Sequence, residues 1–483
     1  RQMVRSPKYS AAYIGYEFIH NAHYIMGLRG LRGRNTKLHF MEHHPAHAAS
    51  AFLVSPFDRA ALLSIDYIGE WAATWAGVGE GTVVRRLFSE HYPNSLGVFY
   101  TAITDYLGFL RANDEYKVMG LASYGEPEYL DEFRKIVQLR PEGRYRIDLS
   151  WFKCHYLPGS RQGYVSDAFL KRFGPPRRKG EAIEERQANI AASAQAVLEE
   201  VVLHIARHLH EQTASENLCL AGGVALNCAM NGRLLRESPF ERFYVQPAAG
   251  DDGIAIGAAF QLYHGLTGAE RSFAMDDARI GPEYSDDEIR TFLDLAKLPY
   301  ETPPDLVARA AELIAGGNIV GWFQGRMEFG PRALGARSIL ADPTRPEMKD
   351  LINTHVKHRE EFRPFAPSCL EEHADEYFEG CDRASPFMLF VYPVKPEKRE
   401  EVPAITHVDG TARVQTVSRE TQPLYYDVIK AFSRLRGVPM VLNTSFNVMG
   451  EPIVNTPAEA IRCFYSTGMD ALVIGKYVAL KGH

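Results

Sequence analysis

The sequence predicts an α/β protein of two or three domains. Apolar, strand-like runs recur at residues 59–71, 217–223 and 319–323, with an acid or glycines at the end of the first two, and amphipathic helical stretches separate them. At 483 residues the chain is long enough to bury more than one hydrophobic core. Its composition, with 46% hydrophobic and 24% charged residues, is that of an ordinary globular protein and excludes disordered and fibrous classes.

The charge balance excludes several kinds of partner. A formal net charge of −6 means that the chain lacks the excess of positive charge expected of a protein that binds nucleic acid or an anionic membrane. No apolar run approaches the length of a membrane span, and residues 1–5 are not a secretory signal, so we expect a cytoplasmic location. The six cysteines form no CxxC pair, which favours buried reduced thiols over a zinc ribbon or a disulfide framework.

The first chemically suggestive stretch is residues 41–50. Its two imidazoles, His43 and His47, are four residues apart, and Asp66 closes the buried strand that follows. Two histidines and a carboxylate suit a divalent metal with open positions for substrate oxygens. Pro45 fits the first turn of a helix, which would leave His43 just outside that helix and His47 within it.

The same spacing occurs in His204 and His208, on a long amphipathic helix of residues 185–212. No acid at a strand end lies nearby in sequence, so this second pair predicts only a partly solvated helix face.

Residues 74–78 and 83–88 resemble strands of a meander. Residues 113–122 mix polar residues with an apolar turn, and Lys117 there is either a substrate contact or a solvated loop lysine.

Two further junctions resemble ligand sites. The double glycine Gly222 and Gly223 stands between a buried strand and a helix, where a ligand can approach the backbone and its N–H groups. The acidic turn of residues 250–253 opens an apolar helix, and its acids either complement the helix dipole or bind a ligand. Together with Asp66, these junctions predict one nucleotide and metal cleft.

A polar stretch with glycine and proline, residues 267–288, predicts a boundary between domains at 1–280 and 281–483. The second region carries basic residues beside glycine- and proline-marked turns, where a rigid backbone can aim cations at oxyanions. These residues predict phosphate or carbamate binding, and they are Arg332, Arg337, Lys357 and Arg363. A further arginine, Arg413, and a hydroxyl and amide loop at residues 441–447 follow.

The motifs together resemble the ATP-dependent O-carbamoyltransferases of antibiotic, toxin and nodulation-factor biosynthesis. The resemblance covers nearly the whole chain, and its most specific pieces are GPRALGARSILADP (330–343), KHREEFRPFAPS (357–368), HVDGTARVQTV (407–417) and LNTSFN (442–447), joined by EHHPAHAASAF (42–52) and KVMGLASYG (117–125). The resemblance implies an N-terminal actin/hexokinase-like ATPase-fold domain and a C-terminal YrdC-like α/β domain.

The resemblance also implies roles for individual residues. Iron or another divalent metal would be held by His43, His47, Asp66 and Asp251, with Asp252 as the alternative to Asp251. The nucleotide cleft would involve Gly222, Gly223 and Asn227. Carbamoyl phosphate would be bound by Arg332, Lys357, Arg363 and Arg413, with Asn443 and Ser445 completing the pocket. Catalysis would fall to Lys357, Arg332, Arg363, His43 and His47.

Two departures from the family pattern matter. The family begins with a strand, turn and strand that hold a His–Asp pair, and this chain has nothing matching it, so acceptor and acid/base residues are expected outside the sets above. Asp66 is followed by residues 67–70 in the order Tyr-Ile-Gly-Glu, where the family pattern is Asp-Gly-x-Gly-Glu. This change is expected to alter the pocket beside the metal.

The expected reaction has two stages. Carbamoyl phosphate and ATP, the latter with or without Mg²⁺, would give carbamoyl-adenylate in the C-terminal domain, because that step requires concentrated positive charge. The carbamoyl group would then pass at the metal site to a hydroxyl of a small molecule in secondary metabolism, such as antibiotic biosynthesis. The sequence names neither the acceptor nor the metal. Neither nucleic acid nor a membrane is an expected partner, and the chain is expected to be a monomer or a homodimer.

Two other functions stay open at this point. One is a tRNA or hydrogenase-maturation carbamoyltransferase, which the acidic charge balance and the absence of CxxC pairs disfavour. The other is a non-catalytic ATP-binding scaffold, which the presence of both the histidines and the basic residues disfavours.

Overall fold

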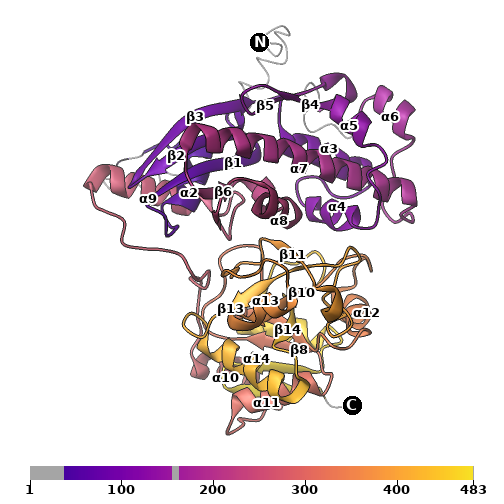
Figure 1. Cartoon of the computed structure of the whole chain (residues 1–483). Helices are drawn as coiled ribbons and strands as arrows, with labels where there is room; N and C mark the ends of the chain where they lie inside the picture. Colours follow the sequence, from indigo (N-terminus) through magenta and orange to yellow (C-terminus); the bar gives the residue numbers. More distant parts are fainter. Residues whose placement is uncertain (1–36, 38, 155–162, 482–483) are drawn as a thin grey trace.

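The computed structural model describes residues 37, 39–154 and 163–481. Residues 1–36, where the first predicted domain begins, lie outside the described part. The described chain contains two β-sheets with helices on both faces, one built before residue 246 and one after residue 319 (Figure 1). The predicted α/β class is confirmed.

The first sheet has five strands in the order β3-β2-β1-β6-β7. The strand β1 runs antiparallel to β2, which is antiparallel to β3, whereas β6 is parallel to β1 and β7 to β6. Their bounds are β1 (Arg59–Gly69), β2 (Ala72–Glu80), β3 (Val83–His91), β6 (Asn217–Ala221) and β7 (Arg242–Val245). The predicted buried strand and the meander that follows it are therefore confirmed, in a mixed sheet as expected of an actin/hexokinase-like domain.

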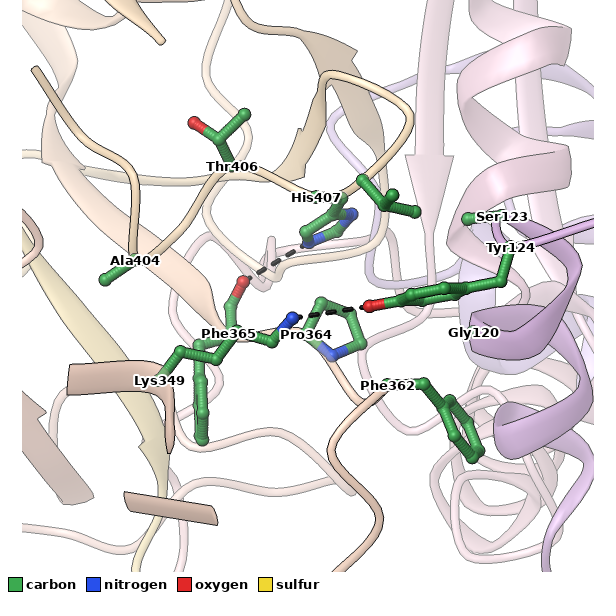
Figure 2. Close-up of a pocket in the computed structure, with 11 residues that line it drawn as sticks. Gly120, Ser123, Tyr124, Lys349, Phe362, Pro364, Phe365, Ala404, Thr406 and His407 are labelled. Carbon is green, nitrogen blue, oxygen red and sulfur yellow. Dashed lines mark hydrogen bonds between the residues drawn. The ribbon is translucent and has the colours of Figure 1, made fainter. Parts of the chain in front are cut away.

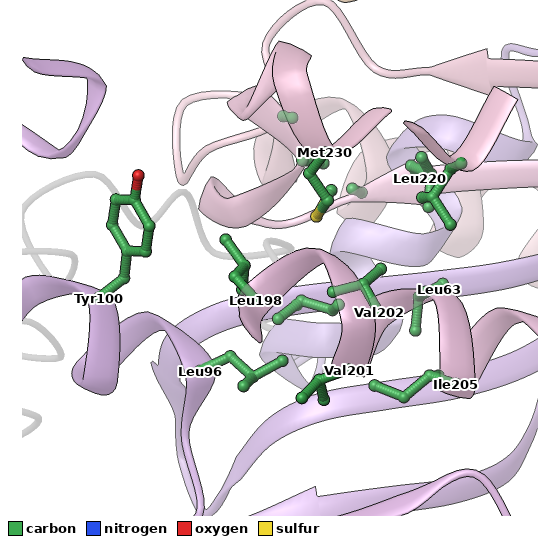
Figure 3. Packing of buried hydrophobic residues seen from close by; sticks show 14 of the residues in the cluster. Leu63, Leu96, Tyr100, Leu198, Val201, Val202, Ile205, Leu220 and Met230 are labelled. Atoms are coloured by element: carbon green, nitrogen blue, oxygen red, sulfur yellow. The ribbon is translucent and has the colours of Figure 1, made fainter. Parts of the chain in front are cut away.

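Alternation along β1 assigns the two faces of this sheet. Ser64 bonds the imidazole of His44 on α2, whereas Leu63 packs against α7, which presents Val201, Val202 and Ile205 to the sheet (Figure 3). The apolar stripe of α7 is thus what holds the strand that carries Asp66. The covering helices are α2 (His43–Phe52) and α9 (Ile254–Thr267) on one face, and α3 (Leu96–Tyr106) and α7 (Glu185–Thr213) on the other.

The remaining elements of the first half lie around this sheet. Two of them, α4 and α8, face the second half of the chain (Figure 1). The bounds are α4 (Glu115–Ala122), α5 (Leu130–Ile136), β4 (Val137–Arg140), β5 (Arg144–Ile147), η2 (Leu149–Trp151), α6 (Asp167–Phe173), η3 (Gly223–Leu226) and α8 (Cys228–Glu237).

The second sheet has seven strands in the order β13-β10-β14-β9-β8-β15-β16. One core fills the side of α10 and α15, and another fills the side of α11 and α14, so this sheet is also covered on both faces, as expected of a YrdC-like α/β region. The strands are β8 (Val320–Phe323), β9 (Arg337–Ala341), β10 (Ala366–Leu370), β13 (Gln415–Val417), β14 (Met440–Ser445), β15 (Ala471–Ile474) and β16 (Tyr477–Leu480).

The helices and minor elements of the second half have the following bounds: α10 (Asp286–Leu295), α11 (Leu306–Ala315), α12 (Met348–Ile352), η4 (Asn353–Lys357), η5 (Glu371–His373), α13 (Ala374–Tyr377), β11 (Val391–Pro393), η6 (Pro396–Lys398), β12 (Thr411–Arg413), α14 (Pro423–Arg436) and α15 (Pro457–Tyr465). Between α9 and α10 the chain has no helix or strand, in the segment where we predicted the boundary. Residues 387–389 of the second half join the core of the first, so the two halves share a packed interface.

The cysteines and the helices bear on two of the general expectations from the sequence. All six cysteines lie in the described residues, where they are buried and no disulfide joins them. Among the described helices, none combines the length and the apolarity that crossing a membrane requires.

Candidate functional site

The histidine stretch brings four ligand atoms together. The Nε2 atoms of His43 and His47 are 3.1 Å apart, and Asp66 Oδ2 lies 3.0 Å from the first and 3.1 Å from the second. Asp251 Oδ1 lies 3.5 Å from each imidazole nitrogen. The four predicted residues therefore meet at one point, and Asp251, not Asp252, provides the fourth atom.

The local fold of α2 differs from the expectation in one respect. The helix begins at His43, so His43 is its first residue and not a residue just before it. Pro45 still lies in the first turn, where backbone N–H groups have no partner within the helix, so its missing N–H has no cost there. As a result His43 and His47 share one helix face, four residues apart.

Neighbouring groups fix the orientation of these ligands. The carboxylate of Glu70 accepts the backbone N–H of His43 at 3.2 and 3.3 Å, and the backbone N–H of Gly223 donates to Asp66 Oδ1 at 3.1 Å. His44 lies between His43 and His47 in the sequence, but its imidazole contacts Ser64 Oγ and the carbonyl of Ala72 instead of the cluster. Burial lowers the pKa of His44 to about 4. His44 is thus a structural residue of α2.

The electrostatics of the cluster favour an ionised carboxylate. Burial alone would raise the pKa of Asp66, but the bonds from His43 and His47 outweigh burial and hold that pKa well below its usual range. Burial alone would lower the pKa of His47, but Asp251 and Asp66 raise it. The cluster therefore combines carboxylate charge with imidazole nitrogens, as metal sites do.

The donor set fits a divalent metal ion. Ligands bound at about 2.0–2.2 Å to a common ion lie roughly 3.0–3.5 Å from one another. The two imidazole nitrogens have this spacing from each other and from both carboxylate oxygens, and all four atoms lie within 4.8 Å of one another. The Asp251 side chain is 75% exposed, which leaves one side of the cluster open. The Nδ1 atom of His47 is buried and has no hydrogen-bond partner among the described residues, so Asp66 and packing orient this ring.

The predicted nucleotide residues lie directly beside this cluster. Gly222 has φ +85°, and a Cβ there would lie 2.2 Å from the carbonyl oxygen of Ile65, so only glycine fits this close approach to β1. Asn227 caps α8 and exchanges two hydrogen bonds with Gln195, at 2.9 and 3.0 Å. The amide of Asn227 is thus held by protein groups, and its predicted nucleotide role stays a prediction.

A second cluster, of cations, lies in the second half of the chain. It consists of the four predicted residues together with one that we did not predict, and its members are Arg332, Lys357, Arg359, Arg363 and Arg413, hereafter the cation cluster. Arg359 lies two residues after Lys357 in a motif that we had singled out, and this proximity was the available signal.

Lys357 ends a π-helical turn and is caged by neutral oxygens. Its ammonium donates to the carbonyl and the hydroxyl of Ser445 and to the carbonyl and side-chain oxygen of Asn447, the last at 2.7 Å. Burial lowers its pKa well below the ordinary lysine value, and Arg359 adds to the effect. Ser445 therefore lies next to Lys357, and its predicted role in binding carbamoyl phosphate stays a prediction.

The cation cluster has more positive charge than nearby carboxylates can balance. Burial, with the charges of Arg413 and Arg363 adding to its effect, lowers the pKa of Arg332 to about 9. The Nε atoms of Arg332 and Arg413 are buried without a hydrogen-bond partner, and neither arginine has an ion pair within the described part of the chain. Buried cations without counter-charges are costly, so the arrangement is that of a binding site for an anion.

Two residues that we associated with anion binding have side chains that bond to backbone carbonyls inside the protein. The guanidinium of Arg337 donates to the carbonyls of Gln324 and Gly325 and lies 3.6 Å from the ring centroid of Phe323, inside the protein. The amide of Asn443 donates to the carbonyl of Ala333 at 3.1 Å. Asn443 therefore supports the turn that carries Arg332, whereas Arg337 supports the segment that follows β8.

The first half of the chain also reaches the cation cluster. Arg332 donates to the carbonyl of Leu226 at 3.3 Å, and Arg363 lies 4.6 Å from the ring centroid of Tyr116 on α4. Figure 2 shows the adjoining contact, in which Tyr124 points toward Lys349 and His407 toward the carbonyl of Phe365. Lys117 is buried in this interface and is not the solvated loop lysine that we considered.

Comparison with known proteins gives two family matches. The model described as "Carbamoyltransferase N-terminus" matches residues 10–260, and the one described as "Carbamoyltransferase C-terminus" matches residues 311–481. Together they cover most of both halves of the chain.

Individual relatives extend over similar ranges. An uncharacterized protein of Synechocystis sp. is 46% identical over 92% of this chain and 76% of its own length. The nodulation protein NolO of Bradyrhizobium diazoefficiens is 44% identical over 91% and 79%, and NolNO of Sinorhizobium fredii is 43% identical over 92% and 64%. Among solved structures, HypF of T. kodakarensis has a TM-score of 0.28 and 18% identity over 48% of this chain and 38% of its own, too weak a likeness to support an argument.

Proposed function

The chain belongs to the carbamoyltransferase family, and we propose that it makes carbamoyl-adenylate from carbamoyl phosphate and ATP and transfers the carbamoyl group to a hydroxyl of a small-molecule natural product. The observation that carries this proposal is the cation cluster, whose half-buried Arg332 and Arg413 have no ion-pair partner among the described residues and each bury an Nε atom that has no hydrogen-bond partner there. Carbamoyl phosphate and ATP are anions that can supply the missing charge.

In the first stage, carbamoyl phosphate is hydrolysed to carbamate and inorganic phosphate. A carbamate oxygen then attacks the α-phosphorus of ATP, the bond to the β-phosphate bridge breaks, and carbamoyl-adenylate and pyrophosphate form. Arg332, Arg363 and Arg413 bind phosphoryl oxygens and stabilise the negative charge that develops on them. Lys357, whose N–H groups donate to oxygens of Ser445 and Asn447, contributes its positive charge beside these oxygens without a direct hydrogen bond to them.

In the second stage, the acceptor hydroxyl attacks the carbamoyl carbon, the bond to the adenylate oxygen breaks, and AMP leaves. The side chains of His43, His47, Asp66 and Asp251 would hold a divalent metal, iron or another, beside the reacting groups. When bound, such an ion supplies a Lewis acid for phosphate and carbonyl oxygens. Glu70 and Gly223 keep His43 and Asp66 oriented toward that position.

The proposal is tested by exchange of labelled pyrophosphate into ATP. The purified protein should catalyse exchange that depends on carbamoyl phosphate, because formation of the adenylate is reversible. Exchange that does not respond to carbamoyl phosphate would contradict the first stage. A mass-spectrometric screen of hydroxylated compounds for gain of a carbamoyl group tests the second stage, and the relatives named nodulation proteins make nodulation oligosaccharides the first compounds to screen.

A further inference from the structure

An ion pair links the segment that carries Arg359 and Arg363 of the cation cluster to the first half of the chain. The ammonium of Lys117, on α4, lies 3.0 Å from Glu360 Oε1, a residue 243 positions later in the sequence. The Lys117 side chain is 10% exposed and that of Glu360 is 30% exposed, so the pair is largely shielded from solvent. Charges in such surroundings interact more strongly than surface charges do.

Glu360 occupies an unfavourable place for a protein that binds anions. It lies between Arg359 and Arg363 in the sequence, and its Oε2 is 3.9 Å from a guanidinium nitrogen of Arg363. An uncompensated carboxylate at this point would pair with Arg363 and repel a phosphate group. The cation cluster therefore requires something that draws Glu360 away.

Lys117 has the geometry for this task. It contacts Glu360 more closely than Arg363 does, and Asp114, 3.2 Å from the same ammonium, holds Lys117 on its other side. Lys117 is also one of the groups that lower the pKa of Glu360, against burial. A second cation near Glu360, Arg177, donates its N–H groups to the carbonyls of Leu107 and Glu181 instead.

We infer that Lys117 is a positioning residue that keeps Glu360 from closing a short ion pair with Arg363, so that the positive charge of the anion site in the second half depends on α4 of the first half being docked against it. The inference rests on the proposed function, because it takes the cation cluster as the carbamoyl phosphate site. If Lys117 has this role, the interface between the two halves contributes to carbamoyl phosphate binding, and Lys117 acts without direct contact with the substrate.

A double-mutant cycle that removes the two charges, one at a time and together, tests this inference. Lys117→Met should weaken carbamoyl phosphate binding, measured by titration calorimetry, by about tenfold, because Glu360 is then free to pair with Arg363. Glu360→Gln should bind carbamoyl phosphate as tightly as the parent protein or more tightly. Lys117→Met with Glu360→Gln should restore the parent affinity within about twofold, since the carboxylate beside Arg363 is gone, while Asp114 keeps its hydrogen bonds from the Leu110 N–H and the Tyr116 hydroxyl.

A matched control is available in the same interface. Lys349→Met removes the contact of Lys349 with Tyr124, at 3.3 Å, without altering Glu360, and should leave the affinity unchanged (Figure 2). Failure of the double variant to recover, or loss of affinity in the Lys349 variant equal to that of Lys117→Met, would overturn the inference. A parent protein that binds carbamoyl phosphate but shows no exchange into ATP would contradict the proposed function instead, and the binding cycle would still decide the role of Lys117.

Discussion

Asp66 lies 3.0 Å from His43 and 3.1 Å from His47, and Gly223 holds its other oxygen with a backbone N–H. One carboxylate thus joins β1, α2 and the glycine junction after β6. A metal-binding measurement tests this relationship. Asp66→Asn should weaken Fe²⁺ or Zn²⁺ binding by at least about tenfold, because it removes a charged ligand. Asp252→Asn, one residue from the fourth ligand, is the matched control and should bind metal normally.

The glycine junction should be intolerant of a side chain. Gly222→Ala places a Cβ 2.2 Å from the carbonyl oxygen of Ile65 at a φ of +85°, and should destabilise the protein by about 2 kcal/mol or more. Gly265→Ala on α9 has no atom within 4 Å of the new Cβ and should be neutral or stabilise by up to about 1 kcal/mol. Urea unfolding of both variants checks the difference, and equal stability would contradict the close approach.

Glu328 should stabilise the turn that carries Arg332. Its buried Oε1 accepts the backbone N–H groups of Leu334, Ala336 and Arg337 at 2.8, 2.7 and 3.1 Å. Glu328→Gln weakens these charge-assisted bonds and should lower the free energy of unfolding by about 1–3 kcal/mol. Denaturant unfolding measures the change. An unaltered unfolding midpoint would show that this carboxylate does not support the turn.

His407 should make stability depend on pH. Burial lowers its pKa to about 4, with Asp409 opposing and Arg413 adding to the effect. The folded pKa lies below the unfolded value of about 6.5, so between these values the unfolded chain binds the extra proton, and stability is lost as pH falls from about 6.5 to 4. His407→Gln should remove the part of this loss that His407 contributes, at most about 3 kcal/mol, and leave the part that His44 contributes, whose pKa is also about 4. Urea unfolding between pH 4 and 7 compares the two proteins, and an unchanged pH dependence in the variant would contradict the role of His407.

Sequence reasoning identified the histidine and aspartate ligands because a strand end, a helix start and an acidic turn each have a local signature. It could not choose between Asp251 and Asp252, since the choice depends on how one turn is oriented in space. Arg337 had the same local signature as Arg332, yet its side chain enters the core. The pairing of Lys117 with Glu360 could not be read from the sequence, because it depends on how the two halves pack.

The central claim is that the two clusters serve different stages of one reaction. The most direct test measures carbamoyl phosphate-dependent pyrophosphate exchange and carbamoyl transfer in two double variants. Lys357→Ala with Arg363→Ala should lose exchange by about a hundredfold or more, because it removes charge stabilisation of the adenylation step. His43→Ala with His47→Ala should retain exchange within about threefold and lose transfer. Intact exchange in the first variant, or loss of exchange in the second, would contradict the division of labour between the cation cluster and the histidines.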